Sequence, residues 1–437
     1  MKAEHEGKTK DPPGYVFPGD TGVSSTSIQS RWNNWGPRLG FAYDLLGTGK
    51  ISLRGGWGMF YSDVRQQSLN NISSNEPFGL SLAVTQPTGG LANPYADTGN
   101  PFPFHPPATA QERQSFKFIL PLTTVTEWDP DFRNAIVQQW NLSIQQQLFS
   151  DWVLTLAYAG STGNHLFIQN QLSPTVFGKP GPNANSRRIY APYYSSIVDM
   201  LSVGNSSYNG LQVSANKRFH RGLTILVNYT WSKSIDEGSN DGSAPSNPYN
   251  IRNDRAVSDF DIPHKFVASF VWQIPGSGLN SALARTLAGG WELNGIFTFQ
   301  MGTPFTVTSG VDNSQSGINA DHANLIGDPH LAGGRSTAEI IRQYFNTAAF
   351  TVNAPGTFGT AGRNILFGPG VRNIDFGVIK TFAMRERYKV QFRAEAFNLF
   401  NHPNFSNPNA NVSAGTFGAI TAAGAPRVLQ LALKAMF

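Results

Sequence analysis

Two acidic stretches carry the side chains best suited to chemistry. The first spans residues 236–261 and holds six carboxylates, at Asp236, Glu237, Asp241, Asp254, Asp259 and Asp261. Clustered carboxylate oxygens are the ligands that hard cations such as Ca²⁺ prefer. Arg252 and Arg255 lie among these carboxylates, however, and the spacing is not that of an EF-hand. We therefore expect a solvated loop held together by ion pairs rather than a cation site.

The second stretch, residues 312–330, offers carboxylates and imidazoles in one short segment, at Asp312, Asp321, His322, Asp328 and His330. These side-chain types bind transition metals when a helix or strand brings them to one point. Neither H-x-x-x-H nor H-E-x-x-H spacing occurs here. The sequence thus predicts no metal site in this stretch.

Two glycine-containing motifs resemble catalytic signatures only in part. In SLRGGWGMF, residues 52–60, the glycines lie inside a strand pattern and precede no helix, which excludes a dinucleotide-binding loop. GSTG, residues 160–163, lacks the G-x-S-x-G spacing of a nucleophile elbow. No acid–base pair or triad is visible elsewhere. We expect no catalytic residue and no cofactor, so the chain is not predicted to be an enzyme.

Composition points away from an ordinary soluble protein. Charged residues make up 14% of the 437 positions, against roughly 25% in typical globular domains. No run of about 20 apolar residues occurs, which excludes transmembrane helices. The absence of cysteine excludes thiolate chemistry, and the net charge of +5 is spread thinly, so a nucleic-acid partner is not expected.

Polar and apolar side chains alternate with period two over unusually long segments. In YKVQFRAEAF, residues 388–397, Val390, Phe392 and Ala394 alternate with Gln391 and Arg393. Many such segments exceed the roughly nine to eleven residues that a tilted strand needs to cross a bilayer. The pattern predicts eleven strands, at about 36–46, 50–62, 134–149, 152–168, 206–219, 223–234, 264–274, 289–301, 372–383, 388–397 and 426–437.

The connections between these strands alternate in length. Short turns are expected at 47–49, 150–151, 220–222 and 385–387, and a moderate one at 276–290. Long loops rich in Pro, Gly, Asn and Ser are expected at 63–133, 169–205, 236–261, 302–371 and 400–425. Short turns on one side and long loops on the other are typical of outer-membrane barrels, with the turns facing the periplasm. The predicted fold is all-β: an antiparallel transmembrane β-barrel segment of about eleven strands.

Charged residues within the predicted strands indicate which face meets water. A bilayer disfavours charges on its own side of a barrel, so these side chains are expected to face the lumen. They are Arg38, Asp44, Arg54, Lys265, Glu292, Arg393 and Glu395.

The last ten residues, VLQLALKAMF, form a strand that ends on an aromatic residue. Its apolar face includes Leu429, Leu431 and Leu433, and it finishes at Phe437. This ending resembles the C-terminal signal read by the outer-membrane assembly machinery, which we expect as a partner.

Several blocks resemble the C-terminal half of the barrel of TonB-dependent outer-membrane receptors, in particular the Oar-like group with a carboxypeptidase-regulatory-like N-terminal domain. They are WNNWGPRLGFAYDLLGTGKISLRGGWGMFYSD (32–63), YNGLQVSANKRFHRGLTILVNYTWSKSID (208–236), NPYNIRNDRAVSDFDIPHKFVASFVWQIP (247–275), FRAEAFNLFNHPNF (392–405) and the terminal strand. The blocks occur in the family's order over residues 32–437.

This resemblance implies a Gram-negative outer-membrane receptor that imports a nutrient, a carbohydrate or a metal chelate, with energy coupled through TonB. Such receptors have about 22 strands around a plug. Residues 36–437 are then the C-terminal part of the barrel, and residues 1–35 a loop or linker remnant. The signal peptide, plug and first barrel half, through which the TonB complex would act, are expected in another part of a longer receptor or in a separate chain, unless the gene model is truncated.

Two alternatives remain open at this stage. A passive porin or an adhesin-like outer-membrane barrel would have the same strands and loops without energised transport. A secreted carbohydrate-binding β-sandwich would tolerate the low charge, but it would not produce the strict alternation of loop lengths.

Overall fold

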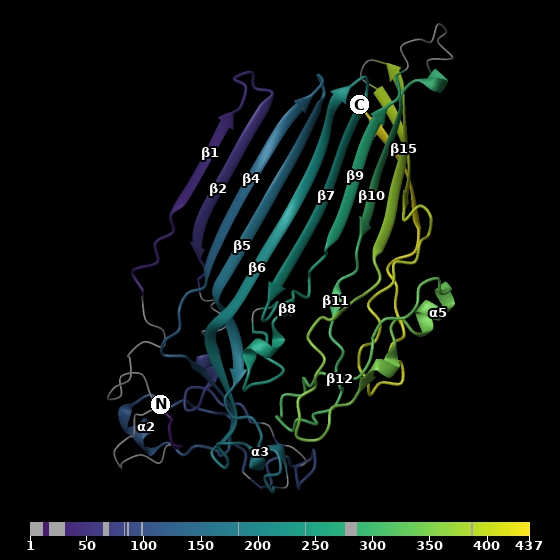
Figure 1. Ribbon diagram of the computed structural model, residues 1–437. Coiled ribbons are helices and arrows are strands. Elements are labelled where there is room, and N and C mark those ends of the chain that lie inside the picture. The colour runs from purple at the N-terminus through teal and green to yellow at the C-terminus, as the bar shows by residue number, and fades with distance from the viewer. Residues whose placement is uncertain are drawn as a thin grey trace.

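Eleven long strands lie side by side in one sheet (Figure 1). The computed structural model describes residues 12–16, 31–63, 70–82, 84, 87–97, 99–181, 183–240, 242–275, 286–385 and 388–437. The long strands are β1 (Arg38–Asp44), β2 (Ile51–Tyr61), β4 (Ile136–Leu148), β5 (Trp152–Gln171), β6 (Tyr194–His220), β7 (Leu223–Asp236), β9 (His264–Gln273), β10 (Trp291–Gln300), β15 (Val371–Arg385), β16 (Tyr388–Phe397) and β17 (Val428–Met436). All eleven predicted strands are confirmed.

These strands follow one another in chain order, and each neighbouring pair is antiparallel. Short turns join them at one end of the sheet, which we call the short-turn end. The opposite end is the long-loop end. Between β6 and β7 the turn consists of Arg221 and Gly222, with φ of 50° and 80°. Positive φ at both central residues is what a tight two-residue hairpin requires, because its twist then matches that of the strands.

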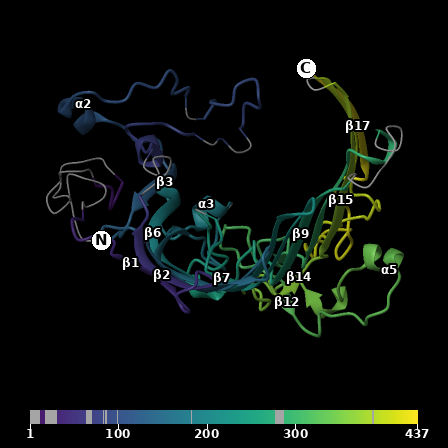
Figure 2. The same ribbon diagram turned by 90° about the horizontal axis from the view of Figure 1, so that it is seen from above.

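The sheet is a curved wall with two open edges. Figure 2 shows it from above as an arc, with β1 and β17 at the two ends. Within the described residues, β1 pairs only with β2, and β17 pairs only with β16. The outer edges of these two strands therefore present unpaired backbone N–H and C=O groups.

Register sorts the side chains onto two faces, because residues directly opposite each other in a sheet point to the same side. One face, the polar face, includes a row of partners that runs across six strands: Arg54, Ser143, Ala157, Gln212, Thr230 and Lys265. The apolar face includes the adjacent row: Leu53, Ile144, Leu156, Val213, Tyr229 and Phe266.

The apolar face is not covered by another layer of the protein. Leu39 at one edge is 72% exposed, and Leu431 and Leu433 at the other are 72% and 75% exposed. A monomer in water rarely exposes so large an apolar area, because each buried Å² of apolar surface is worth about 25 cal/mol. This face must therefore be covered by another apolar phase or partner.

Strand β3 (Leu122–Trp128) departs from the predicted topology. It lies in the predicted long loop 63–133 and pairs in parallel with β6, which begins at Tyr194 rather than near residue 206. The prediction that 63–133 and 169–205 lack strands was wrong. The alternation in LTTVTEW spans only seven residues, and Pro121 directly precedes it, so it is hard to see inside a Pro-rich segment.

Short elements accompany this extension. They are η1 (Asn71–Ser74), α2 (Ala110–Ser115) and α3 (Ala184–Arg187). Two apolar clusters pack β3 against β6, one around Leu122, Val125 and Ile197, the other around Trp128 and Met200. The extension of the sheet thus has its own small core, beyond the last pair of β6 and β7 at Ser206 and Asp236.

The long loops beside β7, β10 and β16 form one unit, the long-loop body, whose described residues are 236–240, 242–262, 302–370 and 398–427. It contains η2 (Ile251–Asp254), β8 (Ala256–Val257), β11 (Pro304–Phe305), β12 (Asn324–Leu325), α5 (Thr337–Arg342), η3 (Thr347–Ala349), β13 (Phe350–Thr351) and β14 (Leu366–Phe367). Its core is an apolar cluster in which Phe345 contacts the rings of Phe305, Phe350 and Phe417. None of the helices in the described ranges is long and apolar enough to cross a membrane.

Candidate functional site: the polar face and the long-loop body

Strand register places seven charged residues of the strands on the polar face. In the β1–β2 pairing, Arg38 and Asp44 lie opposite Gly58 and Ser52, and Arg54 lies opposite Ala42, which places the three charged side chains on one face. Following the paired residues from strand to strand shows that Lys265, Glu292, Arg393 and Glu395 lie on this same face. The seven side chains do not converge on one point but are distributed along the wall.

Local partners account for several of these charges. The Arg393 guanidinium lies 2.7 Å from the Glu395 carboxylate, and the Arg38 guanidinium lies 4.6 Å from the centre of the Phe60 ring. Asp44 accepts the backbone N–H groups of Leu46 and Gly49 and so closes the first short turn. These residues therefore shape a polar wall and do not form a catalytic cluster.

Between the charged positions, the polar face is lined by amides, hydroxyls and small residues. On β4 these are Gln139, Asn141, Ser143 and Gln145, whose partners on β5 are Ser161, Ala159, Ala157 and Thr155. Such a surface offers both hydrogen-bond donors and acceptors without net charge. It suits contact with water, with a protein surface or with a neutral polar solute.

Lys380 is a charged residue on the apolar face, where it pairs with Trp291 and Phe392. It is only 3% exposed. Its ammonium group donates to the backbone carbonyls of Thr286 and Leu287, at 2.7 and 3.0 Å, and to that of Gly289. The rings of Trp291 and Phe382 lie 5.0 Å away. A buried ammonium is tolerated here because its donors are satisfied, and it holds the segment before β10 against the sheet.

Arg363 ties the long-loop body to the end of β7. Its guanidinium forms ion pairs with Asp236, the last residue of β7, and with Asp259, at 3.0 Å. It also donates to the backbone oxygen of Asp254 at 2.9 Å and to Ser239 Oγ at 3.3 Å. A planar guanidinium suits this role because its donors diverge in a fixed geometry.

The other loop carboxylates act as acceptors for neighbouring polar groups. Asp254 accepts the backbone N–H and the hydroxyl of Ser246, Asp261 accepts the N–H of Ser234, and Glu237 accepts the N–H of Asn205.

This arrangement corrects the prediction for segment 236–261. Asp236, Glu237, Asp254 and Asp261 are at most 6% exposed, so these four carboxylates are buried rather than solvated, whereas Asp259 is exposed. The arginine that pairs with this segment is Arg363, not Arg252 or Arg255 as the sequence suggested. Asp241 lies outside the described residues.

The structure does not bring the five candidate ligands of segment 312–330 to one point. Asp321 accepts from Ser314 and from the Asn353 amide, while Asp312 accepts the N–H groups of Ser316 and Gly317. His322 Nδ1 lies 2.9 Å from the Ala361 carbonyl oxygen. Within the described part of the chain, no group of three or more His, Asp or Glu side chains is arranged to hold a metal ion.

The same segment leaves one exposed local pair. The His330 imidazole lies 2.8 Å from the Asp328 carboxylate. Hydrogen bonds from the backbone and side chain of His330 hold the pKa of Asp328 below its usual range. The pair is exposed and local, so it stabilises a turn and does not reach the other three residues.

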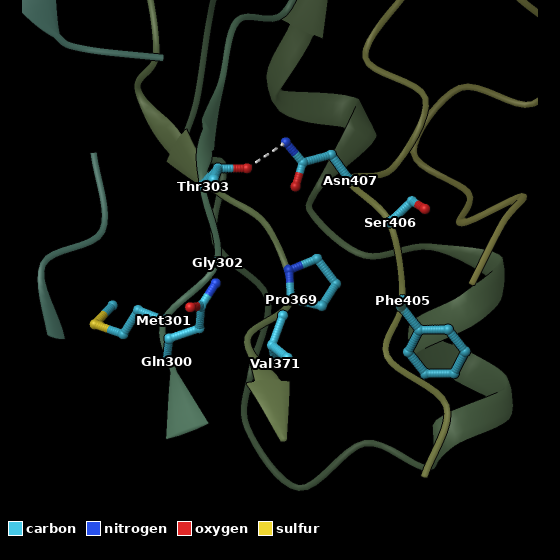
Figure 3. A pocket seen from close by; sticks show the side chains of 9 residues that line it. All are labelled: Gln300, Met301, Gly302, Thr303, Pro369, Val371, Phe405, Ser406 and Asn407. Atoms are coloured by element: carbon cyan, nitrogen blue, oxygen red, sulfur yellow. Dashed lines mark hydrogen bonds between the residues drawn. The ribbon is translucent and has the colours of Figure 1, made fainter. Parts of the chain in front are cut away.

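A shallow pocket of about 330 Å³ opens where β10 ends and β15 begins. Three chain segments line it, 300–303, 369–371 and 405–407 (Figure 3). Asn407 Nδ2 donates to Thr303 Oγ1 at 3.3 Å, and this hydrogen bond closes one side. A side chain at Gly302 would collide with the Gly368 carbonyl, so glycine is required for this close approach. The lining is neutral, with amide and hydroxyl groups beside Val371 and Phe405.

The C-terminal strand occupies the edge of the wall. Leu429, Leu431, Leu433 and Phe437 are 68%, 72%, 75% and 96% exposed. The three leucines pair with Ala396, Ala394 and Phe392, which places them on the apolar face.

Sequence reasoning missed Arg363 and the pairing of β3. Arg363 lies 127 positions from Asp236, so no local spacing indicates the ion pair. The only sequence signal is an arginine in a segment rich in Gly and Asn, TAGRN, which is common in loops without a structural ion pair.

A family model described as an outer membrane beta barrel domain matches residues 3–430. The chain belongs to this family. Membership explains why eleven long antiparallel strands leave an apolar face uncovered: the protein lies in the outer membrane, where lipid covers that face.

Several solved outer-membrane proteins are similar to this barrel domain. The outer membrane transporter YddB from Escherichia coli is 9% identical, with a TM-score of 0.49, over 92% of this chain and 40% of that one. The ferric enterobactin receptor PfeA from Pseudomonas aeruginosa is 15% identical, with a TM-score of 0.46, over 92% and 40%. The iron transporter FrpB from Neisseria meningitidis is 10% identical, with a TM-score of 0.42, over 91% and 38%.

This barrel domain spans about two fifths of the length of the solved structures that it matches. At such identities the likeness concerns the chain path, not the ligand. No curated protein sequence matches the chain.

Proposed function

We propose that this chain forms the C-terminal part of the barrel of a TonB-dependent receptor of the Oar-like group, and that its polar face lines the lumen. The sequence blocks quoted above support the group. The open arc of eleven strands carries the proposal, because a barrel that spans a bilayer must close to satisfy its edge hydrogen bonds. In this proposal residues 36–437 are barrel wall, and residues 1–35 are a linker or loop.

The odd number of strands indicates that the rest of the barrel comes from a different chain segment and not from a second copy of this one. Because eleven is odd, β1 and β17 run in the same direction across the membrane. Two copies of this chain, related by an axis along the pore, would therefore meet at two parallel seams. An odd number of further strands closes the barrel with antiparallel seams throughout, as bacterial barrels with even strand numbers do. Eleven more would give the roughly 22 strands of outer-membrane transporters.

The function proposed for the complete receptor is energised uptake of a nutrient, a carbohydrate or a metal chelate. The long-loop body would then face the outside, with the short turns in the periplasm. Partners in this proposal are lipid, the outer-membrane assembly machinery, a plug within the lumen, and the TonB complex acting through that plug. This chain contributes wall and loops, and no catalytic step is assigned to it.

The test compares three strains of the source bacterium: wild type, one lacking this gene and one lacking TonB. Each is grown on oligosaccharides as sole carbon source and on ferric siderophores as sole iron source. We expect one nutrient whose use is lost in both mutants. A nutrient lost only with this gene would indicate a passive porin instead. Full growth of the gene deletion on every source would contradict an uptake role.

A further inference from the structure

Three side chains form a row across neighbouring strands of the sheet extension. Asp199 on β6 is the direct partner of Glu127 on β3 and of Asn170 on β5. Direct partners share a face, so the three side chains are neighbours. We call this set the acid row. It lies beyond the pair of Ser206 and Asp236 that ends the β6–β7 ladder, and therefore outside the membrane-spanning part of the sheet.

The acid row contains buried acceptors without donors. Asp199 and Asn170 are 7% and 8% exposed, and the Oδ1 atom of each has no hydrogen-bond partner. The Asn170 amide is fixed, because its Nδ2 donates to the Pro248 carbonyl at 3.2 Å. If both carboxyl groups are ionised, the row presents only acceptor oxygens. Buried polar atoms are almost always paired, so this set requires a proton or another cation.

The charged side chains that raise the pKa of Asp199 are both negative. From β3 and the residue after it come Glu127 and Asp129, whereas β5 contributes the neutral Asn170. Segment 242–248, whose Pro248 contacts Asn170, carries no charged side chain. Burial, with smaller effects from Glu127 and Asp129, raises the pKa of Asp199 to about 7. Burial, followed by Asp129, also raises the pKa of Glu127.

We propose that Asp199 is a proton-operated latch that fastens β3 to β6. As a carboxylic acid, Asp199 supplies the one donor that the acid row lacks. Once ionised, it places a second carboxylate beside Glu127 on the adjacent strand and leaves its own buried oxygen unpaired. Loss of one proton thus weakens the six-pair parallel ladder that attaches β3, and the segment preceding it, to the wall.

The direction of the pH effect follows from proton linkage. The pKa of Asp199 is higher when β3 is docked than in an undocked chain, where it returns to its ordinary value of 3.8. The docked state therefore binds a proton that the undocked state releases. Docking is strongest below that ordinary value, weakens as the pH rises towards about 7, and stays weak above it.

Hydrogen–deuterium exchange of the full-length protein, purified from the outer membrane in detergent, tests the latch. Protection of the β3 amides is measured at pH 5, 6, 7 and 8 and normalised to intrinsic exchange rates. We expect protection to fall by up to about ten-fold per pH unit between pH 5 and 7, as release of one proton requires, and then to level off. Protection of β3 that does not change with pH would overturn the proposal.

Variants separate the latch from other causes. Asp199→Asn provides a permanent donor, so β3 protection should be high and independent of pH. Glu127→Gln removes the neighbouring charge and should move the levelling-off point to lower pH, which keeps the test decisive if Asp199→Asn fails to fold. Asp131→Asn, at an exposed carboxylate of the same segment, should behave as wild type. If β3 protection instead rises with added Ca²⁺ and falls with EDTA at constant pH, a metal ion rather than a proton occupies the acid row, and the latch proposal is refuted.

Discussion

Arg363 and Asp236 form a buried ion pair between segments 127 positions apart in the sequence. Asp236 ends β7, so the pair anchors the long-loop body directly to a strand of the barrel wall. Because the same guanidinium also reaches Asp259 and the Asp254 carbonyl, Arg363 joins segment 302–370 to three positions of segment 236–262. The loops are therefore held to one another and to the wall, and do not behave as independent segments.

Replacing Arg363 should loosen the long-loop body. Arg363→Met leaves the carboxylate of Asp236, 3% exposed as a residue, without its cation. Breaking such a buried pair costs about 3–5 kcal/mol. Arg363→Lys should cost less, because it keeps the charge but reaches fewer acceptors.

Limited proteolysis of the long-loop body in urea measures this loss. Arg342→Met, at an exposed position of α5, is the matched control and should leave the urea dependence unchanged. Equal resistance of the Arg363 and Arg342 variants would show that the ion pair does not hold the loops.

Adjacent positions on β6 test the assignment of the two faces. Val213 lies on the apolar face and Gln212 on the polar face. Val213→Arg should destabilise the barrel by about 2–4 kcal/mol, the cost of a lipid-facing arginine near the bilayer centre, whereas Gln212→Arg should be tolerated. Urea unfolding in lipid vesicles measures both. The reverse order of stabilities would mean that the polar face, not the apolar one, meets lipid.

Lys380 should stabilise the short-turn end of the wall. Lys380→Met removes the donor shared by three backbone carbonyls at 286–289, and a lost buried partner costs about 1–3 kcal/mol. Thermal unfolding should detect the decrease. Lys389→Met, an exposed lysine on the polar face, serves as control. If both variants unfold at the same temperature, the hydrogen bonds from Lys380 to the three carbonyls contribute no stability.

The last residue should matter for assembly more than for the fold. Phe437 is 96% exposed, so Phe437→Ala removes almost no packing. We expect the variant to reach the outer membrane as a minor fraction of the wild-type amount, as measured by immunoblotting of membrane fractions. Met436→Ala, one residue earlier, should assemble normally. Normal amounts of the Phe437 variant would argue against a C-terminal assembly signal.

The period-two alternation was sufficient to predict the strands of the wall. Each strand has an apolar face and a polar face, so apolar and polar residues alternate along its sequence. Strand β16 shows this clearly: Val390 and Phe392 lie on one face, and Gln391 and Arg393 on the other. The same rule failed at Lys380, where three carbonyls supplied by the preceding segment compensate a charge on the apolar face.

Features that depend on distant segments were not predictable from one sequence. The partner of Asp236 is Arg363. Strand β3 pairs with residues of β6 about 70 positions later, and this separation can change with loop length without changing the pairing. Buried loop carboxylates were mistaken for solvated ones for the same reason. Glu237, Asp254 and Asp261 accept hydrogen bonds from backbone N–H groups and a hydroxyl that the chain brings to them only on folding.

The central claim is that this wall is part of a larger receptor, and the intact mass of the native product tests it most directly. Outer-membrane fractions of the source bacterium are probed with antibody to residues 385–437, and the captured protein is weighed by mass spectrometry. A product well above 47.6 kDa is the result we predict. A product near 47.6 kDa would contradict a single-chain receptor, and uptake by this chain alone would be untenable.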